Sequence, residues 1–320
     1  MEYTLFCLTP RLEKWLVEYI RQLPIREDNL SFDKRVLIID QLNLFFRNYI
    51  VNPSVSTDGM PIGGLRGCIQ SLQKVVRESK PDMIVICWDG QGGSKKRKLL
   101  KKDYKAGRKP IRLNRSIRNL SEEQEVDNKI WQQTRLIEYY NQIPVIQFMF
   151  DSTEADDIIA YVANHKCLNK RSIVEKFNIH PTNFAMARAM AGDKSDNIDG
   201  IPGLGLKTIS KRFPFLREEK TATFSDIISR CKKELEEKEI KAFRNILESE
   251  NILRRNYQMM QLYAPLLSIG AKNIINETFK DPDNTFNKTE LIKMMIKDGF
   301  GEINFIELFQ HLNKISLDKG

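Results

Sequence analysis

The sequence contains few of the residues that many hydrolases use for nucleophilic catalysis. Its three histidines lie far apart and lack a triad partner, so histidine-based catalysis is not expected. Its five cysteines are odd in number and never form a CxxC pair, which argues against a disulfide framework and against a zinc site. Any hydrolytic chemistry must therefore come from carboxylates and a metal ion.

Long hydrophobic runs are also missing. The apolar residues near the N-terminus are interrupted by Pro10 and Arg11, and no later segment approaches the length of a membrane span. The sequence has no internal repeat and no low-complexity tract. Together with the unpaired cysteines, this predicts a cytoplasmic protein that has no membrane partner.

Positive charge is plentiful and concentrated in one part of the chain. The 51 Lys and Arg residues outnumber the 42 Asp and Glu residues, which gives a formal net charge of +9. Residues 95–118 contain twelve of these basic residues and a single acid, Asp103. A diffuse surplus would indicate little more than solubility, but a concentrated one favours a polyanionic partner such as nucleic acid.

Three apolar runs, each followed by an aspartate, predict the framework of the fold. Residues 35–40, 83–89 and 144–151 have the composition of buried strands, and helical patterns separate them. Strands that alternate with helices are typical of a mostly parallel sheet in an α/β domain. Functional groups collect beyond the carboxyl ends of such strands, so Asp40 and Asp89 are candidates for a site. One aspartate at a strand end is usually a turn residue or a helix cap, but three in succession are more specific.

More carboxylates follow the third run, in the segment STEADDIIAY at residues 152–161. Acids in the first turn of a helix are favoured by the helix dipole alone, so they need no further function. Helical spacing would place Glu154 and Asp157 on one face and Asp156 off it. Because residues this close to a helix start need not be helical, spacing leaves the choice of metal ligands open.

The run GDKSDNIDGIPGLGLK at residues 192–207 combines acids, glycines and a lysine. Glycines allow a tight turn whose backbone N–H groups can approach a phosphate, and a lysine in the next helix adds charge where the helix dipole already favours an anion. An ordinary surface loop is the alternative interpretation, and the acids upstream make it less favoured. The residues concerned are Asp193, Asp196, Gly200, Gly203, Gly205 and Lys207.

Carboxylates without histidine or cysteine suit hard cations, above all Mg²⁺ or Mn²⁺. Two such ions about 4 Å apart can activate a water molecule and stabilise the leaving oxygen of a phosphodiester. A basic segment beside them would hold the substrate and offset charge in the transition state. The carboxylates, the basic segment and the glycine turn together predict phosphodiester chemistry on nucleic acid.

Three segments resemble the signature blocks of a known family. WDGQGGSKKRKLLKKDYKAGRK, STEADDIIAY and GDKSDNIDGIPGLGLKT are similar to blocks of the structure-specific 5′-nucleases, or flap endonucleases. Within that family the chain most resembles the bacteriophage 5′→3′ exonucleases, including the T-even phage ribonuclease H that removes replication primers. The resemblance covers about residues 30–214 and implies a PIN-like α/β fold in which helices flank a mostly parallel sheet.

The resemblance also assigns roles to the acids and glycines. It implies two divalent metal ions and, on residues 198–207, a helix-hairpin-helix element that grips the duplex and binds K⁺. The implied ligands of the first metal are Asp40, Asp89, Glu154 and Asp156, with Asp157 as a further candidate, and Asp193 and Asp196 are implied to face the second.

Residues 91–125 are implied to form a basic arch. Arg97, Tyr104, Lys105 and Arg108 match the base of this arch, where a lysine and an arginine contact the scissile phosphate and an aromatic ring stacks on a base of the single strand. The 5′ end would pass through the arch. The predicted catalytic residues are therefore Lys105, Arg108, Asp40 and Asp89.

Two departures from the family are visible. Asp199 stands where the family usually has proline, which places an acid near a phosphate. Family members also have a further strand that ends in a pair of aspartates, whereas between Asp157 and Asp193 this chain has no aspartate and only Glu175. We therefore expect that one strand after residue 166 is missing and that the second metal site lacks two ligands.

The expected organisation has four parts. Residues 1–34 form an N-terminal helical extension, residues 35–180 the α/β nuclease domain, residues 181–270 the helix-hairpin-helix region, and residues 271–320 a small helical C-terminal segment. The substrates expected are DNA and RNA–DNA duplexes with 5′ ends or flaps. A single-strand-binding protein or a sliding clamp is a further expected partner of a monomer that works in the cytoplasm, or in the host cytoplasm if a phage encodes it.

Two functions compete on this sequence. The first is a metal-dependent 5′ nuclease, and the second is a homologue that binds branched DNA but cuts it poorly because its second metal is under-ligated. The missing acidic pair favours the second function. The enzyme ranks first because the first-metal carboxylates, Lys105 and Arg108 are all retained. An unrelated nuclease, such as a small RNA-cleaving toxin, would not need the glycine motif.

Overall fold

A computed structural model describes most of the chain from residue 35 onwards. The residues described are 35–106, 114–115, 117, 119–164, 177–262, 265–283 and 285–317. Four predictions fall wholly or partly outside them: the helical extension over residues 1–34, the role of Arg108, the basic arch over residues 91–125, and much of the segment in which a strand is expected to be missing.

Three parallel strands form the sheet of the α/β part. They are β1 (Val36–Asp40), β2 (Met83–Cys87) and β3 (Ile146–Phe148), and their order in the sheet is β1-β2-β3. Nearly every strand residue is buried, as expected for a parallel sheet that is covered on both faces. The three predicted strands and the parallel arrangement are confirmed, although β2 and β3 end before Asp89 and Asp151.

Helices make up most of the remaining described structure. The α/β part contains α2 (Gln41–Val51), α3 (Gly63–Ser79), α4 (Lys95–Leu100), α5 (Glu122–Tyr140) and α6 (Ala155–Asn164). The middle part contains α8 (Pro181–Ala191), the 3₁₀ turn η1 (Lys194–Asp196), α9 (Leu206–Arg212), η2 (Pro214–Arg217), α10 (Phe224–Glu237), α11 (Lys241–Glu248) and α12 (Glu250–Met260). The last part contains α13 (Ile269–Lys280), α14 (Lys288–Lys297) and α15 (Phe305–Leu317).

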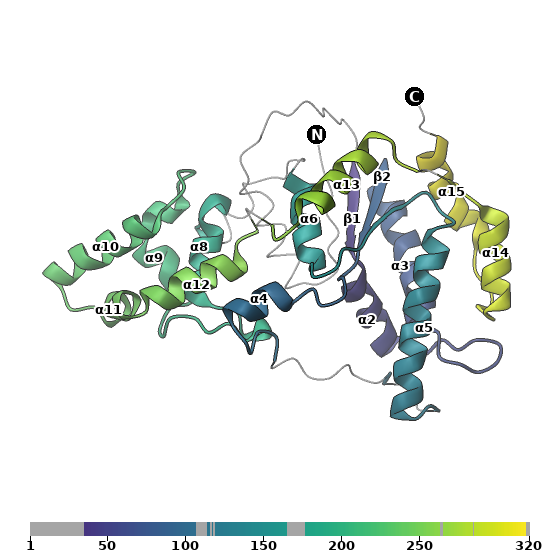
Figure 1. Cartoon of the computed structure of the whole chain (residues 1–320), viewed down its shortest axis with the longest axis horizontal. Coiled ribbons are helices and arrows are strands. Elements are labelled where there is room, and N and C mark those ends of the chain that lie inside the picture. The colour runs from purple at the N-terminus through teal and green to yellow at the C-terminus, as the bar shows by residue number, and fades with distance from the viewer. Residues whose placement is uncertain are drawn as a thin grey trace.

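Alternate residues of β1 face two different hydrophobic cores, one on each side of the sheet. Leu37 and Ile39 point into a core with α2, α3 and α5, whereas Val36 and Ile38 point into a second core with α6. The C-terminal helices complete both, because α14 and α15 join the first core and α13 joins the second. Figure 1 shows these helices on opposite sides of the sheet. The segment predicted as residues 271–320 is therefore part of the α/β core.

A third core holds the middle helices together. Phe184 of α8, Phe213 after α9, Phe243 of α11 and Leu253 of α12 meet in it. Figure 1 shows this helical part beside the sheet, with α10 and α11 farthest from it and α4 lying where the two parts meet. The amide of Asn256 ties α12 to the glycine turn, because it donates to the carbonyl oxygens of Ala189 at 3.0 Å and Asp199 at 2.7 Å.

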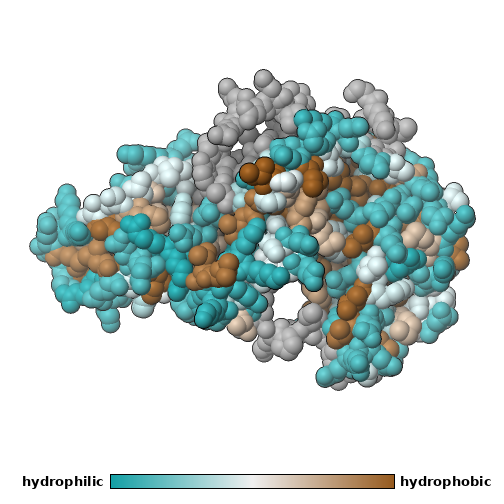
Figure 2. Space-filling view, viewed as in Figure 1, coloured by the Kyte–Doolittle hydropathy of each residue, from teal (hydrophilic) through white to brown (hydrophobic). Residues whose placement is uncertain are grey.

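The surface seen in Figure 2 is mostly hydrophilic, with small hydrophobic patches that are separated from one another. Within the described residues, no helix combines the length and the apolar character that a bilayer span requires.

Candidate active site

Asp40 ends β1 and begins the candidate site. Its carboxylate caps α2 by accepting the Asn43 backbone N–H at 3.1 Å, so the ordinary role of an acid at a strand end is present. The carboxyl group of Asp40 also has a raised pKa. Burial, and then the neighbouring charge of Asp89, raise the pKa of Asp40 from 3.8 to about 6. Asp40 is therefore held in a place where negative charge is not fully compensated.

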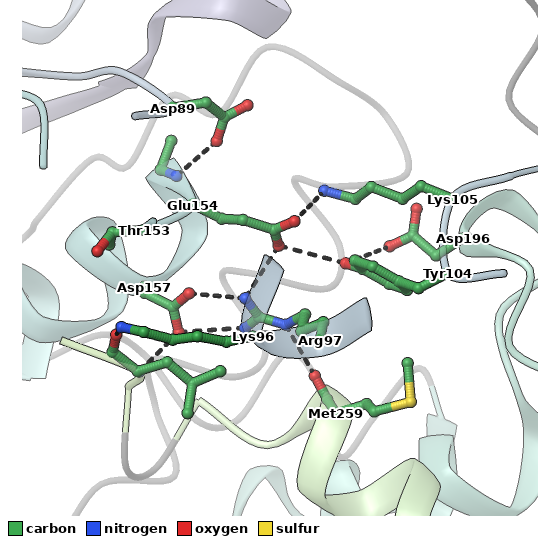
Figure 3. A network of polar contacts seen from close by, with 12 residues as sticks. Asp89, Lys96, Arg97, Tyr104, Lys105, Thr153, Glu154, Asp157, Asp196 and Met259 are labelled. Atoms are coloured by element: carbon green, nitrogen blue, oxygen red, sulfur yellow. Dashed lines mark hydrogen bonds and ion pairs between the residues drawn. The ribbon is translucent and has the colours of Figure 1, made fainter. Parts of the chain in front are cut away.

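Asp89 connects the end of β2 to the acidic segment that begins α6. Its exposed carboxylate accepts the backbone N–H of Ala155 at 2.7 Å (Figure 3). This contact brings the residues after β3 to the same edge of the sheet as Asp40. Burial, followed by the charge of Asp40, raises the pKa of Asp156 well above its usual range, and Glu154 and Asp89 add to the effect. The charges of the four acids predicted for the first metal therefore influence one another.

Glu154 is the most deeply buried of these four acids, with 2% of its surface exposed. Its Oε2 accepts hydrogen bonds from Arg97 Nη1 at 2.9 Å and from the Tyr104 hydroxyl at 3.2 Å, and its Oε1 accepts one from Lys105 Nζ at 2.7 Å (Figure 3). The predicted catalytic lysine thus lies directly against a predicted metal ligand.

The donor chemistry of this cluster fits a hard divalent cation, because all four candidate ligands are carboxylates and two of them have raised pKa values. Their present geometry is not that of a formed site. Among the residues that the structure describes, no three Asp, Glu, His or Cys side chains are arranged to hold one ion. Glu154 instead directs its oxygens toward Arg97, Tyr104 and Lys105.

The two acids predicted for a second metal have different surroundings. Asp193 caps the 3₁₀ turn η1 by accepting the Ser195 N–H at 2.9 Å, and it forms an ion pair with Arg188 of α8 at 2.6 Å. The carboxylate of Asp196 lies 3.4 Å from the Tyr104 hydroxyl. Asp196 therefore faces the first cluster, whereas Asp193 is already neutralised.

The glycine turn has the backbone features that the sequence indicated. A Cβ on Gly200 would lie 2.2 Å from the carbonyl oxygen of Ala191, and Gly203 has a φ of +82°, so both positions favour glycine. Gly205 caps α9 with open space around it, and Lys207 is exposed in the first turn of that helix. Their contact with a DNA phosphate stays a prediction.

Comparison with known proteins agrees with this combination of sheet, acids and glycine turn. Residues 35–175 match the protein family described as 5′-3′ exonuclease, N-terminal resolvase-like domain. These residues belong to the 5′-3′ exonuclease family.

Curated proteins similar to this chain share low sequence identity with it over long alignments. The 5′-3′ exonuclease of Bacillus subtilis (strain 168) is 26% identical over 217 residues, covering 59% of this chain and 72% of that protein. Flap endonuclease Xni of Shewanella woodyi is 28% identical over 249 residues, covering 71% of this chain and 92% of that protein.

A solved structure of the bacteriophage T5 D15 flap endonuclease, a pseudo-enzyme-product complex with DNA and metal ions, has a TM-score of 0.52 and 18% identity. The alignment covers 83% of this chain and 99% of that one, and the likeness shows a shared fold.

Arg97, which the sequence predicts to contact DNA, is bound within the exonuclease domain in this structure. Only 3% of it is exposed, and its guanidinium binds Asp157, Glu154 and the Met259 carbonyl oxygen. Burial opposes its charge, but Asp157 and Glu154 raise its pKa above the usual value. Both carboxylate oxygens of Asp157, a candidate metal ligand, accept hydrogen bonds from this guanidinium. A buried guanidinium requires such partners because an unpaired buried charge is costly.

Tyr104 also differs from its prediction. Instead of standing free to stack on a base, its ring is 3% exposed and packs with Ile198, Met259 and Met260. Its hydroxyl lies between Glu154 and Asp196. The tyrosine thereby connects the first carboxylates of the exonuclease domain to the glycine turn.

Sequence reasoning missed Arg188 and Lys101 as partners of the predicted acids. Arg188 neutralises Asp193, and Lys101 Nζ lies 2.6 Å from Asp103 and 3.6 Å from Asp199. The acid at position 199, which departs from the family pattern, therefore has a lysine nearby. No local signal distinguishes Lys101 from the other lysines of residues 95–118, so only the fold could identify it.

Proposed function

We propose that this protein is a metal-dependent 5′ nuclease that acts as a 5′→3′ exonuclease and flap endonuclease. Its substrates would be DNA and RNA–DNA duplexes with 5′ ends or flaps, including the RNA primers of replication. The observation that carries the proposal is the group of Asp40, Asp89, Glu154 and Asp156 beside Lys105 at the carboxyl edge of a parallel sheet.

Each part of the site has a proposed task. Bound Mg²⁺ or Mn²⁺ would supply an activated water molecule and charge for the leaving oxygen. Asp40 and Asp156 have uncompensated negative charge with which to hold a cation. Lys105 would place its ammonium against the scissile phosphate. The exposed backbone around Gly205 and the ammonium of Lys207 would grip the duplex, with K⁺ bound at the same turn.

A second function, binding of branched DNA with impaired cleavage, is favoured by one observation. Asp193 pairs with Arg188 and caps a 3₁₀ turn, which leaves Asp196 as the carboxylate of that turn that faces the first cluster. An under-ligated second metal would lower the rate of cleavage without lowering affinity for DNA. We therefore propose that activity is reduced relative to a nuclease with a complete second site.

We also propose an oligomeric state, a location and partners, on the basis of the sequence and of nuclease activity. The protein would act as a monomer in the cytoplasm, or in the host cytoplasm for a phage-encoded chain. It would cooperate with a single-strand-binding protein or a sliding clamp of a replisome.

The proposed function can be tested with a 5′-labelled flap duplex and Mg²⁺. Wild type should release the labelled flap, whereas Asp40→Asn and Asp89→Asn should cleave it much more slowly. Glu290→Gln, which changes a partly exposed acid of α14 far from the candidate site in the sequence, is the matched control and should cleave like wild type.

Three results of this test have distinct meanings. Equal cleavage by wild type and both aspartate variants would exclude the carboxylate mechanism. Salt-sensitive binding of the flap by wild type without any cleavage would support the impaired homologue instead. Wild type that neither binds nor cleaves the flap would overturn both functions.

A further inference from the structure

Lys105 is held against Glu154, one acid of the carboxylate cluster. Its Nζ lies 2.7 Å from Glu154 Oε1 and 5.1 Å from the centroid of the Tyr104 ring, and 19% of its side chain is exposed. Its backbone N–H donates to the Asp196 carbonyl oxygen at 2.9 Å, which fixes the residue at both ends. Figure 3 shows the ammonium pointing at Glu154 from the side of Asp196.

The charge of Lys105 reaches more than one acid. It lowers the pKa values of both Asp40 and Asp156, against the burial and the neighbouring acids that raise them. Lys105 therefore contacts one candidate metal ligand, Glu154, directly and acts on Asp40 and Asp156 only through its charge. Arg97 cannot take over this role, because its guanidinium is directed at Asp157, Glu154 and a backbone carbonyl.

The ammonium thus contacts an oxygen of Glu154 that could otherwise bind a divalent cation. A cation coordinated by Glu154 would need the Oε1 lone pairs that Lys105 now uses, and two positive charges a few ångströms apart repel each other.

We propose that Lys105 is the internal counter-ion of the metal-free carboxylate cluster and that a divalent cation displaces its ammonium from Glu154. This inference rests on the proposed function, in which the cluster binds a metal. We expect the displacement to occur by rotation of the side chain, while the backbone N–H of Lys105 stays bonded to Asp196. Once released, the ammonium is free to meet a phosphate, so metal binding and substrate binding become coupled.

The test is the affinity for Mn²⁺, measured by calorimetry or by electron paramagnetic resonance without any substrate. Lys105→Met keeps the length of the side chain and removes its charge. We expect it to bind Mn²⁺ about tenfold more tightly than wild type, as removal of a nearby unit charge predicts. Lys98→Met removes an exposed lysine of the same basic segment and should leave the affinity for Mn²⁺ close to wild type.

Thermal unfolding gives a second measurement that also reports folding. Without metal at neutral pH, Lys105→Met should unfold at a lower temperature than wild type, because the acids lose their counter-ion. Saturating Mn²⁺ should then raise its unfolding temperature by more than it raises that of wild type. This opposite behaviour with and without metal distinguishes a counter-ion from a lysine that is merely structural.

The outcomes separate this inference from the proposed function. If wild type cleaves the flap but Lys105→Met binds Mn²⁺ equally or more weakly, the inference is overturned and the nuclease function stands. If wild type neither binds Mn²⁺ nor cleaves, the proposed function fails and the inference fails with it. Tighter Mn²⁺ binding by Lys105→Met, together with slower cleavage, supports both.

Discussion

Arg97 and Asp157 form a two-armed ion pair at the point where the α/β part meets the helical part. Nη1 lies 2.7 Å from Oδ2 and Nη2 lies 3.1 Å from Oδ1, and both side chains are almost fully buried. Asp157 also accepts the Leu266 N–H at 2.9 Å, and Arg97 donates to the Met259 carbonyl oxygen at 3.1 Å. One pair therefore joins α4, α6, the end of α12 and the segment that follows α12.

Replacement of Arg97 should destabilise the whole protein. We expect Arg97→Ala to lower the free energy of unfolding by about 3–5 kcal/mol, because it leaves Asp157 and Glu154 as uncompensated buried charges. Urea unfolding measures this change. Arg254→Ala, which removes an exposed pair with Glu250, is the control and should cost less than about 1 kcal/mol. Equal effects of the two substitutions would contradict a structural role for Arg97.

Asp40 should make the stability of the metal-free protein depend on pH. Its pKa is about 6 in the folded protein against 3.8 ordinarily, so the folded state binds this proton more tightly than the unfolded chain. The contribution is therefore fully present below about pH 4 and is lost as the pH rises through about 6, by up to about 3 kcal/mol.

The measurement is urea unfolding in EDTA from acid to neutral pH, for wild type and Asp40→Asn. The wild-type free energy of unfolding should fall relative to that of the variant across this range. A difference between the two proteins that does not change with pH would show that Asp40 titrates normally.

Gly200 and Gly205 should respond differently to alanine. In Gly200→Ala the new Cβ meets the Ala191 carbonyl oxygen, so we expect a loss of about 1–3 kcal/mol in the free energy of unfolding and weaker duplex binding. In Gly205→Ala the Cβ enters open space, so stability should change by less than about 0.5 kcal/mol. If the backbone at Gly205 approaches a phosphate, duplex affinity in this variant should nevertheless fall. Unchanged affinity would remove Gly205 from the proposed DNA contact.

Lys207 should contribute to DNA binding through charge alone. We expect Lys207→Ala to weaken binding of duplexes of any sequence and to lower the slope of log affinity against log salt by about 1. Fluorescence anisotropy over a range of salt concentrations measures this slope. Lys293→Ala, an exposed lysine of α14, should leave the slope unchanged. A slope that is the same in all three proteins would place Lys207 outside the interface.

Much of the scaffold could be predicted because its signals are local. The apolar runs before Asp40, Asp89 and Asp151 identify strands, and the alternation with helices identifies a parallel sheet. The glycine turn was also recognisable, since Gly203 needs a positive φ and Gly200 needs a close backbone approach. The sequence could not predict which acid each basic residue of 95–118 would contact, because Arg97, Lys101 and Lys105 have similar neighbours in the sequence.

The sequence by itself determined the strands, the placement of acids at their carboxyl ends, and the glycine turn, because periodicity and backbone preference act over a few residues. Only the tertiary structure decided which charges meet. Arg97 donates a hydrogen bond to the carbonyl oxygen of Met259, which is 162 residues away in the sequence. The Tyr104 hydroxyl contacts Asp196, which is 92 residues away. Such pairings depend on the packing of distant segments, and burial then decides whether a cation is held within the protein or is available to a substrate.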